Sequence, residues 1–321
     1  MLIKKRLISL VIPVFNEELN IEPLYLAVMD VFAKIEDRYD IELVFTDNHS
    51  TDNTFEKLCA LHELDSRVRV FRFSRNFGYQ KSILTGYLKA RGDAIIQLDC
   101  DLQDPPKMII DFLQSWEEGC YVVYGVRIKR QEHWTINLVR SVFYRLMDFL
   151  SEDHLPVDAG DFRLIDRKIV EVLRQMDDAQ PYLRGTIAAI GFRQKGIPYE
   201  RHARERGNTN FSVKELFRLA IDGILNHSIV PLRLASFFGI VVSSISIIAI
   251  SSYAIGKLIF QYDWPAGFTT LTILTLVGIG INALFLGIIG EYLGRIYQQV
   301  KRKPLVVIDD VRDKNDRNLS L

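Results

Sequence analysis

Up to residue 130 the chain alternates between short apolar runs and polar clusters. The runs are rich in β-branched residues, which is typical of buried strands. They predict strands at residues 7–14, 41–46, 68–73, 94–98 and 121–126. The segments between the first four runs carry cap residues and apolar spacings typical of helices. Strands that alternate with helices predict an α/β fold with a doubly wound sheet.

The polar clusters follow the first four predicted strands directly. In doubly wound sheets, ligands bind at the carboxyl ends of the strands. The clusters therefore predict one binding site at that edge of the sheet. Its candidate residues are Asn16, Glu17, Asp47, Asn48, Ser74, Arg75, Asp99 and Asp101.

The run at residues 95–106 is the most informative of these stretches. Asp99 and Asp101 are two positions apart at the end of a predicted strand, and Gln103 adds a neutral oxygen. Hard oxygen ligands without His or Cys favour Mg²⁺ or Mn²⁺. An Asp-x-Asp pair alone is more often an acidic turn, so the metal interpretation depends on the other motifs.

The middle of the chain is less regular. Residues 139–150 have the spacing of an amphipathic helix, and residues 158–163 are interpreted as an acidic turn that contains glycine. A loop at residues 201–210 precedes a helix at residues 213–225, which either lies on a membrane surface or faces a core. The tail predicts a strand at residues 305–308, followed by a charged, disordered end.

Two uncharged apolar runs occupy residues 234–256 and 264–290. Each exceeds the roughly 20 residues that cross a hydrocarbon core, so they predict a transmembrane hairpin. Basic residues lie outside both runs, which predicts that both outer flanks are cytoplasmic. The expected segments are a cytoplasmic domain (1–212), a juxtamembrane helix (213–231), two transmembrane helices (232–260 and 264–293) and a cytoplasmic tail (294–321).

Composition narrows the possible functions. The chain has 40 basic and 40 acidic residues, so the formal net charge of zero argues against binding to nucleic acid. The three cysteines have no paired spacing and indicate neither a zinc site nor a disulfide framework. Pro13 and the acidic residues after it interrupt the first apolar run, which excludes a signal peptide.

Taken together, four motifs resemble those of the family 2 glycosyltransferases. They are residues 13–17 (PVFNE), 46–52 (TDNHSTD), 99–106 (DCDLQDPP) and 158–164 (DAGDFRL), followed by the two apolar runs. The chain is most similar to the polyisoprenyl-phosphate glycosyltransferases, in particular the bactoprenol glucosyltransferase branch. The resemblance implies a Rossmann-like A-type glycosyltransferase domain followed by two C-terminal transmembrane helices.

The resemblance also assigns roles to residues. Pro13, Phe15 and Glu17 correspond to a nucleotide-contacting loop, and Asp47 corresponds to an acid that binds the base or ribose. Asp99, Asp101 and Gln103 correspond to the motif for the metal and diphosphate. The chain departs from the family at Asn48, His49 and Asn210, where a second acid, a glycine and a lysine are usual.

The acceptor implied by the resemblance is a polyisoprenyl (undecaprenyl) phosphate. A phosphate monoester is already nucleophilic at pH 7, so Asp158 or Asp161 is expected either to take its last proton or to position it. Arginines bind phosphate through two parallel hydrogen bonds, although a solvated surface charge is the commoner role for any one of them. The candidates for the acceptor phosphate are Arg127, Arg140, Arg163, Arg204 and Arg206.

The expected enzyme is an integral protein of the bacterial cytoplasmic membrane that transfers one sugar from a nucleotide diphosphate sugar. UDP-glucose rests on the branch resemblance alone, and mannose and amino sugars remain open. One alternative is a processive polysaccharide synthase, but Arg184 lacks the tryptophan that usually follows it in such enzymes. Another is an idle nucleotide-binding membrane scaffold. Glycines at residues 278–294 also leave a homo-oligomer possible.

Overall fold

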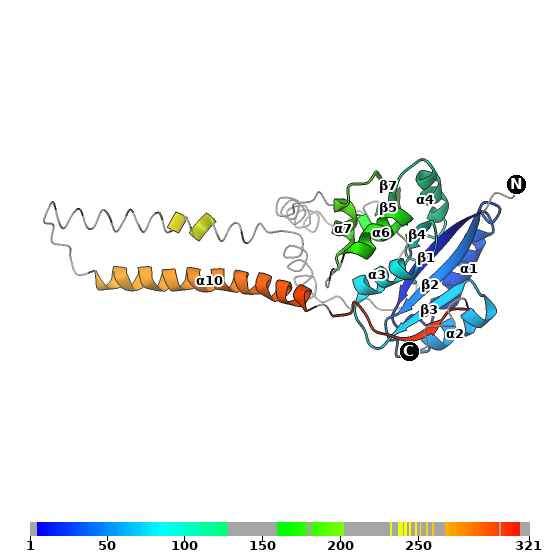
Figure 1. Ribbon diagram of the computed structural model, residues 1–321, viewed down its shortest axis with the longest axis horizontal. Coiled ribbons are helices and arrows are strands. Elements are labelled where there is room, and N and C mark those ends of the chain that lie inside the picture. Colours follow the sequence, from blue (N-terminus) through cyan, green and yellow to red (C-terminus); the bar gives the residue numbers. More distant parts are fainter. Residues whose placement is uncertain are drawn as a thin grey trace. The chain divides into compact units, whose positions relative to one another are not determined.

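The computed structural model describes residues 5–127, 159–176, 181–201, 267–301 and 303–314, together with residue 178 and scattered positions from 232 to 259. These residues belong to two compact units. The first unit holds the N-terminal residues and the tail from residue 303, and the second holds the long helix α10 (Phe268–Val300) (Figure 1). The predicted helices at residues 139–150 and 213–225 lie outside the described residues.

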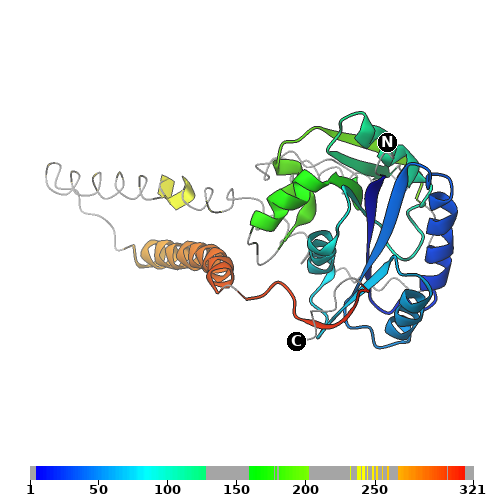
Figure 2. The same ribbon diagram turned by 45° about the vertical axis from the view of Figure 1, so that its right-hand side comes forward.

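The described part of the first unit forms an eight-stranded mixed sheet with the order β7-β5-β6-β4-β1-β2-β3-β8 (Figure 2). The four strands at its centre, β4, β1, β2 and β3, are parallel to one another. The predicted α/β fold is therefore confirmed, although three of the outer pairings are antiparallel. The strands are β1 (Arg6–Val14), β2 (Tyr39–Asp47), β3 (Val68–Phe73), β4 (Ala94–Gln97), β5 (Val122–Arg127), β6 (Ala159–Asp166), β7 (Gln194–Tyr199) and β8 (Ile308–Arg312).

Helices cover both faces of this sheet because its central strands are apolar on both sides. On β1, Leu10 and Ile12 pack into one core, while Val11 between them packs into the other. The first core is closed by α1 (Ile21–Phe32), α2 (Thr54–Leu64) and α4 (Met108–Glu117). The second is closed by α3 (Tyr79–Lys89), α6 (Arg167–Gln175) and α7 (Leu183–Ala189).

Strand β6 corrects the predicted acidic turn at residues 158–163. It lies between β4 and β5 and is antiparallel to both. Phe162 and Leu164 are buried in the first core, whereas Asp161 and Arg163 project to the opposite face. The period of two is that of a strand, and the buried charges are tolerated because each has a partner in the fold.

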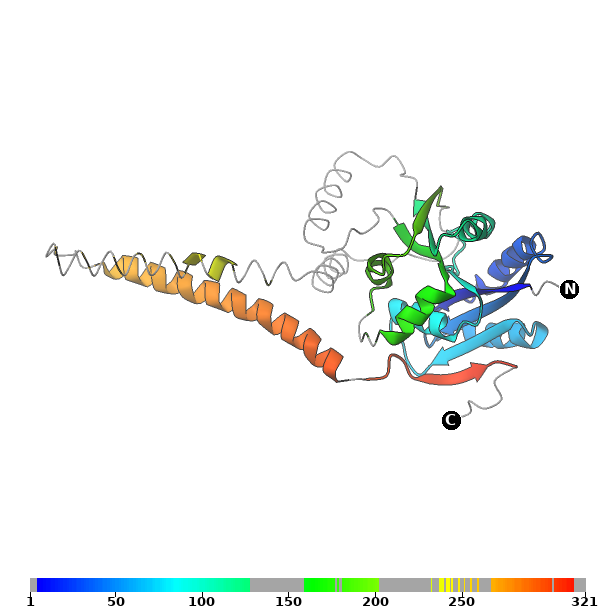
Figure 3. The same ribbon diagram turned by 45° about the horizontal axis from the view of Figure 1, so that its top comes forward.

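The C-terminal tail also differs from its prediction. Its strand is β8 at Ile308–Arg312, three residues later than expected, and it is antiparallel to β3 at the sheet edge (Figure 3). The charged residue Asp313 is ordered and nearly fully buried. It accepts hydrogen bonds from Arg69 Nε at 2.8 Å and from Arg91 at 2.9 Å, and Arg69 also donates to Glu42 at 2.9 Å. The tail is therefore part of the N-terminal domain.

Helix α10 is 33 residues long and contains residues 268–293 of the second predicted transmembrane segment. Its window Val277–Gly294 has a mean hydropathy of 1.5 and none of it is buried. Among the described residues it is the one helix long and apolar enough to cross a membrane. Most of the first predicted segment lies outside the described residues, so the transmembrane hairpin stays a prediction.

The contact between the tail and the sheet predicts a stability effect. Replacing Asp313 by Ala leaves the buried Arg69 without one of its two acid partners, which should lower the free energy of unfolding by about 2 kcal/mol. The measurement is chemical denaturation of the full chain in detergent, followed by tryptophan fluorescence. Asp310→Ala is the control, because its partner Arg312 is exposed and about 0.5 kcal/mol or less is expected. Equal losses in the two variants would contradict a structural role for Asp313.

Candidate functional site

The loops that follow β1 and β2 are interlocked at the carboxyl edge of the sheet. Asn16 donates its backbone N–H to Ser50 Oγ at 3.0 Å and accepts the N–H of Thr51 on its own side chain at 2.8 Å. The backbone N–H of Glu17 donates to Thr54 Oγ1 at 2.8 Å. Asn16 and His49 have φ values of 55° and 63°, a left-handed conformation that Asn adopts more readily than most residues. Two of the predicted clusters are thus brought together.

Asp47 closes β2 with a fully buried carboxyl group. Its Oδ1 accepts hydrogen bonds from the backbone N–H of Ser50 at 3.0 Å and from Ser50 Oγ at 2.6 Å. Burial raises the pKa of Asp47 despite these bonds and the nearby Arg72, whose Nε lies 3.6 Å from Oδ2. Within the described chain Oδ2 accepts no hydrogen bond, and it is buried beside Arg72.

The loop after β3 holds the third cluster. Asn48 Oδ1 accepts the backbone N–H of Phe77 at 2.8 Å, and the backbone N–H of Ser74 donates to Val307 O at 2.9 Å. The guanidinium of Arg75 lies over the ring of Phe77 at 4.1 Å from its centroid. Asn48 therefore builds the loop, whereas Arg75 is exposed. Of the other predicted nucleotide contacts, Phe15 is exposed and Pro13 is buried within β1, where it shapes the strand end.

The fourth cluster follows β4. Asp99 Oδ1 accepts hydrogen bonds from the hydroxyl of Tyr79 and from Gln97 Nε2 at 2.8 Å. Asp101 Oδ1 accepts the backbone N–H of Gln103 at 3.2 Å, within a turn in which Leu102 has a φ of 56°. All three predicted metal ligands therefore lie in one short loop at the sheet edge.

Negative charge is concentrated around Asp99. Burial, followed by the charges of Asp104, Asp101 and Asp161, raises the pKa of Asp99 to about 6, although the Tyr79 hydroxyl opposes the shift. Carboxylates that repel one another in this way fit a divalent cation, which would compensate them. Within the described ranges no three His, Cys, Asp or Glu side chains surround one point. Asp99, Asp101 and Gln103 offer the oxygen ligands that Mg²⁺ and Mn²⁺ take, and these cations keep coordination positions for phosphate oxygens.

Asp161 on β6 is held by Arg184 on α7. The guanidinium makes two parallel hydrogen bonds to the carboxylate, with Nε at 2.9 Å and an Nη at 2.6 Å. Burial alone would raise the pKa of Asp161, but Arg184, then Arg163 and a hydrogen bond from Gln80, lower it below its usual value. The carboxylate is therefore fixed in its ionised form, which suits positioning better than proton abstraction.

Two of the predicted phosphate-binding arginines contact polar partners; Arg163 is buried and Arg127 is half-buried. Arg163 donates to Gly160 O at 2.9 Å. Arg127 Nε donates to the Tyr199 hydroxyl at 3.4 Å, and Tyr199 in turn donates to the buried Asp104. Arg201 Nε also lies 3.4 Å from Asp104. Arg163 and Arg127 are thus fixed in the fold, and neither is a solvated surface charge.

The remaining predicted residues Asp158, Arg140, Arg204 and Arg206 lie outside the described residues. Sequence reasoning assigned no role to Tyr79, Asp104 or Arg184, which the structure places beside the predicted acids. Asp104 belongs to the motif at residues 99–106, and its position close to Asp99 and Asp101 in the sequence was the only indication of a role. Tyr79 and Arg184 are 20 and 23 residues from their partners, a separation at which the sequence alone gives no indication of contact.

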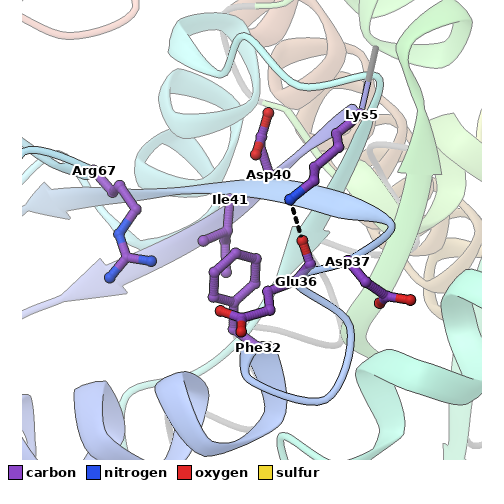
Figure 4. A pocket seen from close by; sticks show the side chains of 7 residues that line it. All are labelled: Lys5, Phe32, Glu36, Asp37, Asp40, Ile41 and Arg67. Carbon is purple, nitrogen blue, oxygen red and sulfur yellow. Dashed lines mark hydrogen bonds between the residues drawn. The ribbon is translucent and has the colours of Figure 1, made fainter. Parts of the chain in front are cut away.

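A separate pocket of about 530 Å³ lies at the other end of the parallel strands (Figure 4). Asp40 and Ile41 line it from the amino end of β2, and Lys5 Nζ donates to the carbonyl of Glu36 at its rim. Charged groups of both signs line this pocket. The predicted nucleotide and metal residues lie at the carboxyl ends of β1 to β4, so this pocket is not the predicted binding site.

Comparison with known proteins matches residues 9–174 to the family described as Glycosyl transferase family 2. The chain is 38% identical over 301 residues to the uncharacterized glycosyltransferase YkcC of Bacillus subtilis (strain 168), covering 94% of this chain and 92% of the relative. It is 33% identical over 302 residues to the bactoprenol glucosyl transferase of Shigella phage SfII, covering 94% and 97%.

Among solved structures, the mannosyltransferase PcManGT from Pyrobaculum calidifontis in complex with GDP-Man and Mn²⁺ is similar with a TM-score of 0.47 and 14% identity. The similarity covers 94% of this chain and 87% of that chain. The family assignment and the mixed α/β sheet agree with the A-type glycosyltransferase fold that the motifs implied.

The Asp161–Arg184 pair predicts a pH-dependent stability effect. Arg184→Gln should lower the free energy of unfolding at pH 7 by about 2 kcal/mol, less than a fully buried pair because Arg184 is partly exposed. The pKa of Asp161 is lowered in the folded state, so the pair stabilises the protein above the carboxyl group's ordinary pKa of 3.8, and this stabilisation is lost as the pH falls through the folded-state pKa. Denaturation at pH 7 and at pH 3 measures the difference.

The matched control is Arg174→Gln, which breaks an exposed pair with Glu171 and should change little at either pH. A loss for Arg184→Gln that is equally large at both pH values would show that Arg184 acts through packing and not through the charge of Asp161.

Proposed function

Because the chain belongs to the family 2 glycosyltransferases, we propose that it transfers a single glucosyl group from UDP-glucose to a polyisoprenyl phosphate at the cytoplasmic face of a bacterial membrane. The observation that carries this proposal is the similarity over nearly the whole chain to proteins named bactoprenol glucosyl transferase. The acids at the carboxyl edge of the sheet support it, because a sugar transfer from a nucleotide diphosphate needs a divalent cation that such acids can hold.

The proposed mechanism assigns the loop after β4 to the diphosphate. Asp99, Asp101 and Gln103 would hold Mg²⁺ or Mn²⁺, which when bound neutralises charge on the leaving nucleoside diphosphate. The interlocked loops after β1, β2 and β3 would bind the nucleoside, with Asp47 as the acid of this site and Arg75 as an exposed cation.

The acceptor phosphate needs positioning more than it needs a base. A phosphate monoester carries its own negative charge at pH 7, and Asp161 is already committed to Arg184. We assign Asp161 to orienting the acceptor side of the site and Arg127 to binding the acceptor phosphate. Arg127 is suited to this because it ends β5 and is held in place by Tyr199.

The tail strand supports the membrane topology within this proposal. Strands of one sheet lie on the same side of a bilayer, because a sheet with open edges cannot cross it. The pairing of β8 with β3 therefore favours an even number of crossings between the two strands. Two crossings, at residues 232–260 and 264–293, satisfy that condition, and the basic flanks favour the cytoplasm for both ends.

The function is tested by incubating the purified full chain with labelled nucleotide sugars and undecaprenyl phosphate, followed by lipid extraction. A lipid that carries one glucose is expected, and UDP-glucose should be the preferred donor. Asp101→Asn should reduce transfer at least 100-fold by removing a carboxylate from the diphosphate loop. Asp111→Asn, which changes an exposed acid on α4, is the matched control and should retain activity.

Other products would redirect the assignment. A polymer in the extract would indicate a processive synthase, and absence of any sugar-bearing lipid with every donor would indicate a nucleotide-binding scaffold. Undiminished transfer in excess EDTA would contradict the role of the cation.

The topology is tested by cysteine labelling in intact cells with a membrane-impermeant reagent. Phe260→Cys lies at the outer end of the first predicted transmembrane segment, next to the predicted external loop, and should be labelled. Asp316→Cys in the tail should react only after the membrane is permeabilised. The three native cysteines, Cys59, Cys100 and Cys120, all belong to the first unit and should be protected from outside. Labelling of both introduced cysteines in intact cells would refute a cytoplasmic tail.

A further inference from the structure

The first turn of α3 contacts two carboxylates that come from different strands. Tyr79 donates its hydroxyl to Asp99, in the loop after β4. Its neighbour Gln80 hydrogen-bonds Asp161 on β6 and also accepts the backbone N–H of Leu183 at 3.1 Å. Two successive residues of one helix therefore connect the predicted metal loop with the Asp161–Arg184 pair.

The hydrogen bonds to Asp99 have a particular geometry. Among the described residues, both of its donors, Tyr79 and Gln97, reach the same oxygen, Oδ1. Gln97 Nε2 also lies 3.2 Å from the Tyr79 hydroxyl, so the three side chains form a closed triangle. Two donors on one oxygen fix the rotation of the carboxylate and leave Oδ2 available for another ligand.

The two donors belong to rigid elements. Gln97 is the last residue of β4 and is fully buried, and Tyr79 is the first residue of α3, which packs on the second core. Tyr79 is 41% exposed and belongs to neither core. The main contact of Tyr79 is therefore the hydrogen bond from its hydroxyl to Asp99.

We propose that Tyr79 is a positioning residue that holds the Asp99 carboxylate through Oδ1, so that Oδ2 faces the divalent cation bound with the nucleotide diphosphate. This rests on the proposed function for the identity of the cation and the nucleotide. Groups that orient a metal ligand change metal affinity about 10–100-fold when they are removed, although they do not touch the metal. A ligand held by two donors loses part of its orientation when one is removed, so the lower end of that range applies.

The test measures metal binding directly. The full chain in detergent micelles is titrated with Mn²⁺ in the presence of UDP, and free Mn²⁺ is measured by electron paramagnetic resonance. Tyr79→Phe keeps the ring and removes only the hydroxyl, and it should weaken Mn²⁺ binding about 10-fold. Binding of UDP in EDTA, measured by calorimetry, should stay unchanged because Tyr79 acts on the metal ligand.

The chain contains a matched control at the opposite end of the sheet. Tyr25 donates to Asp65 Oδ2 at 2.9 Å, and Asp65 lies three residues before the first residue of β3. Tyr25→Phe removes the same type of hydrogen bond and should leave Mn²⁺ affinity unchanged. Gln97→Met removes the second donor to Oδ1 and should weaken Mn²⁺ binding in the same direction as Tyr79→Phe.

Several outcomes would overturn the proposal. They are unchanged Mn²⁺ affinity in Tyr79→Phe, an equal loss in Tyr25→Phe, or no Mn²⁺ binding by the parent protein. Failure of the proposed function is seen separately: a parent protein that binds Mn²⁺ and UDP but transfers no glucose to the lipid would refute that function while the role of Tyr79 remained measurable.

Discussion

Crowding of carboxylates at one edge of the sheet is the constraint on which the rest of the site depends. Asp99, Asp101, Asp104 and Asp161 come from two segments at the ends of β4 and β6, where burial and then the charges of the other three acids raise the pKa of Asp99. Like charges brought together in a partly buried place are unfavourable unless each has a partner. Arg184 compensates Asp161, and Tyr199 and Arg201 contact Asp104. The remaining excess of negative charge lies on the loop that is proposed to bind a cation.

These partners explain why the regions around the sheet are arranged as they are. Helix α7 provides Arg184, the end of β7 provides Tyr199, and α3 provides Tyr79. These elements pack around the central strands, and they also carry the side chains that contact the acids at the edge of the sheet. The fold and the site are not separable here, because the same contacts stabilise the domain and orient the acids.

The sequence pattern predicted the centre of this structure well. Strands β1 to β5 were found because each is a short apolar run that ends at polar residues, and the acids after β4 were identified for the same reason. Strand β6 was missed because Gly160 and the two acids beside it are typical of a turn, although Phe162 and Leu164 alternate with polar residues as in a strand. Its buried charges are stable only with partners that are distant in sequence. Strand β8 was placed three residues early because residues 305–307 are more apolar, whereas pairing with β3 decides the actual register.

The return of the tail to β3 also has a consequence for the order in which the protein is made. Arg69 and Asp313 are 244 residues apart, and domains fold from the N-terminus while synthesis continues. When β3 first joins the sheet, its outer edge has no neighbour, and Arg69 has Glu42 but not yet Asp313. An open edge of this kind can pair with another nascent chain. The edge is covered only after the apolar segments have left the ribosome, so the domain that begins the chain is the last part of it to be completed.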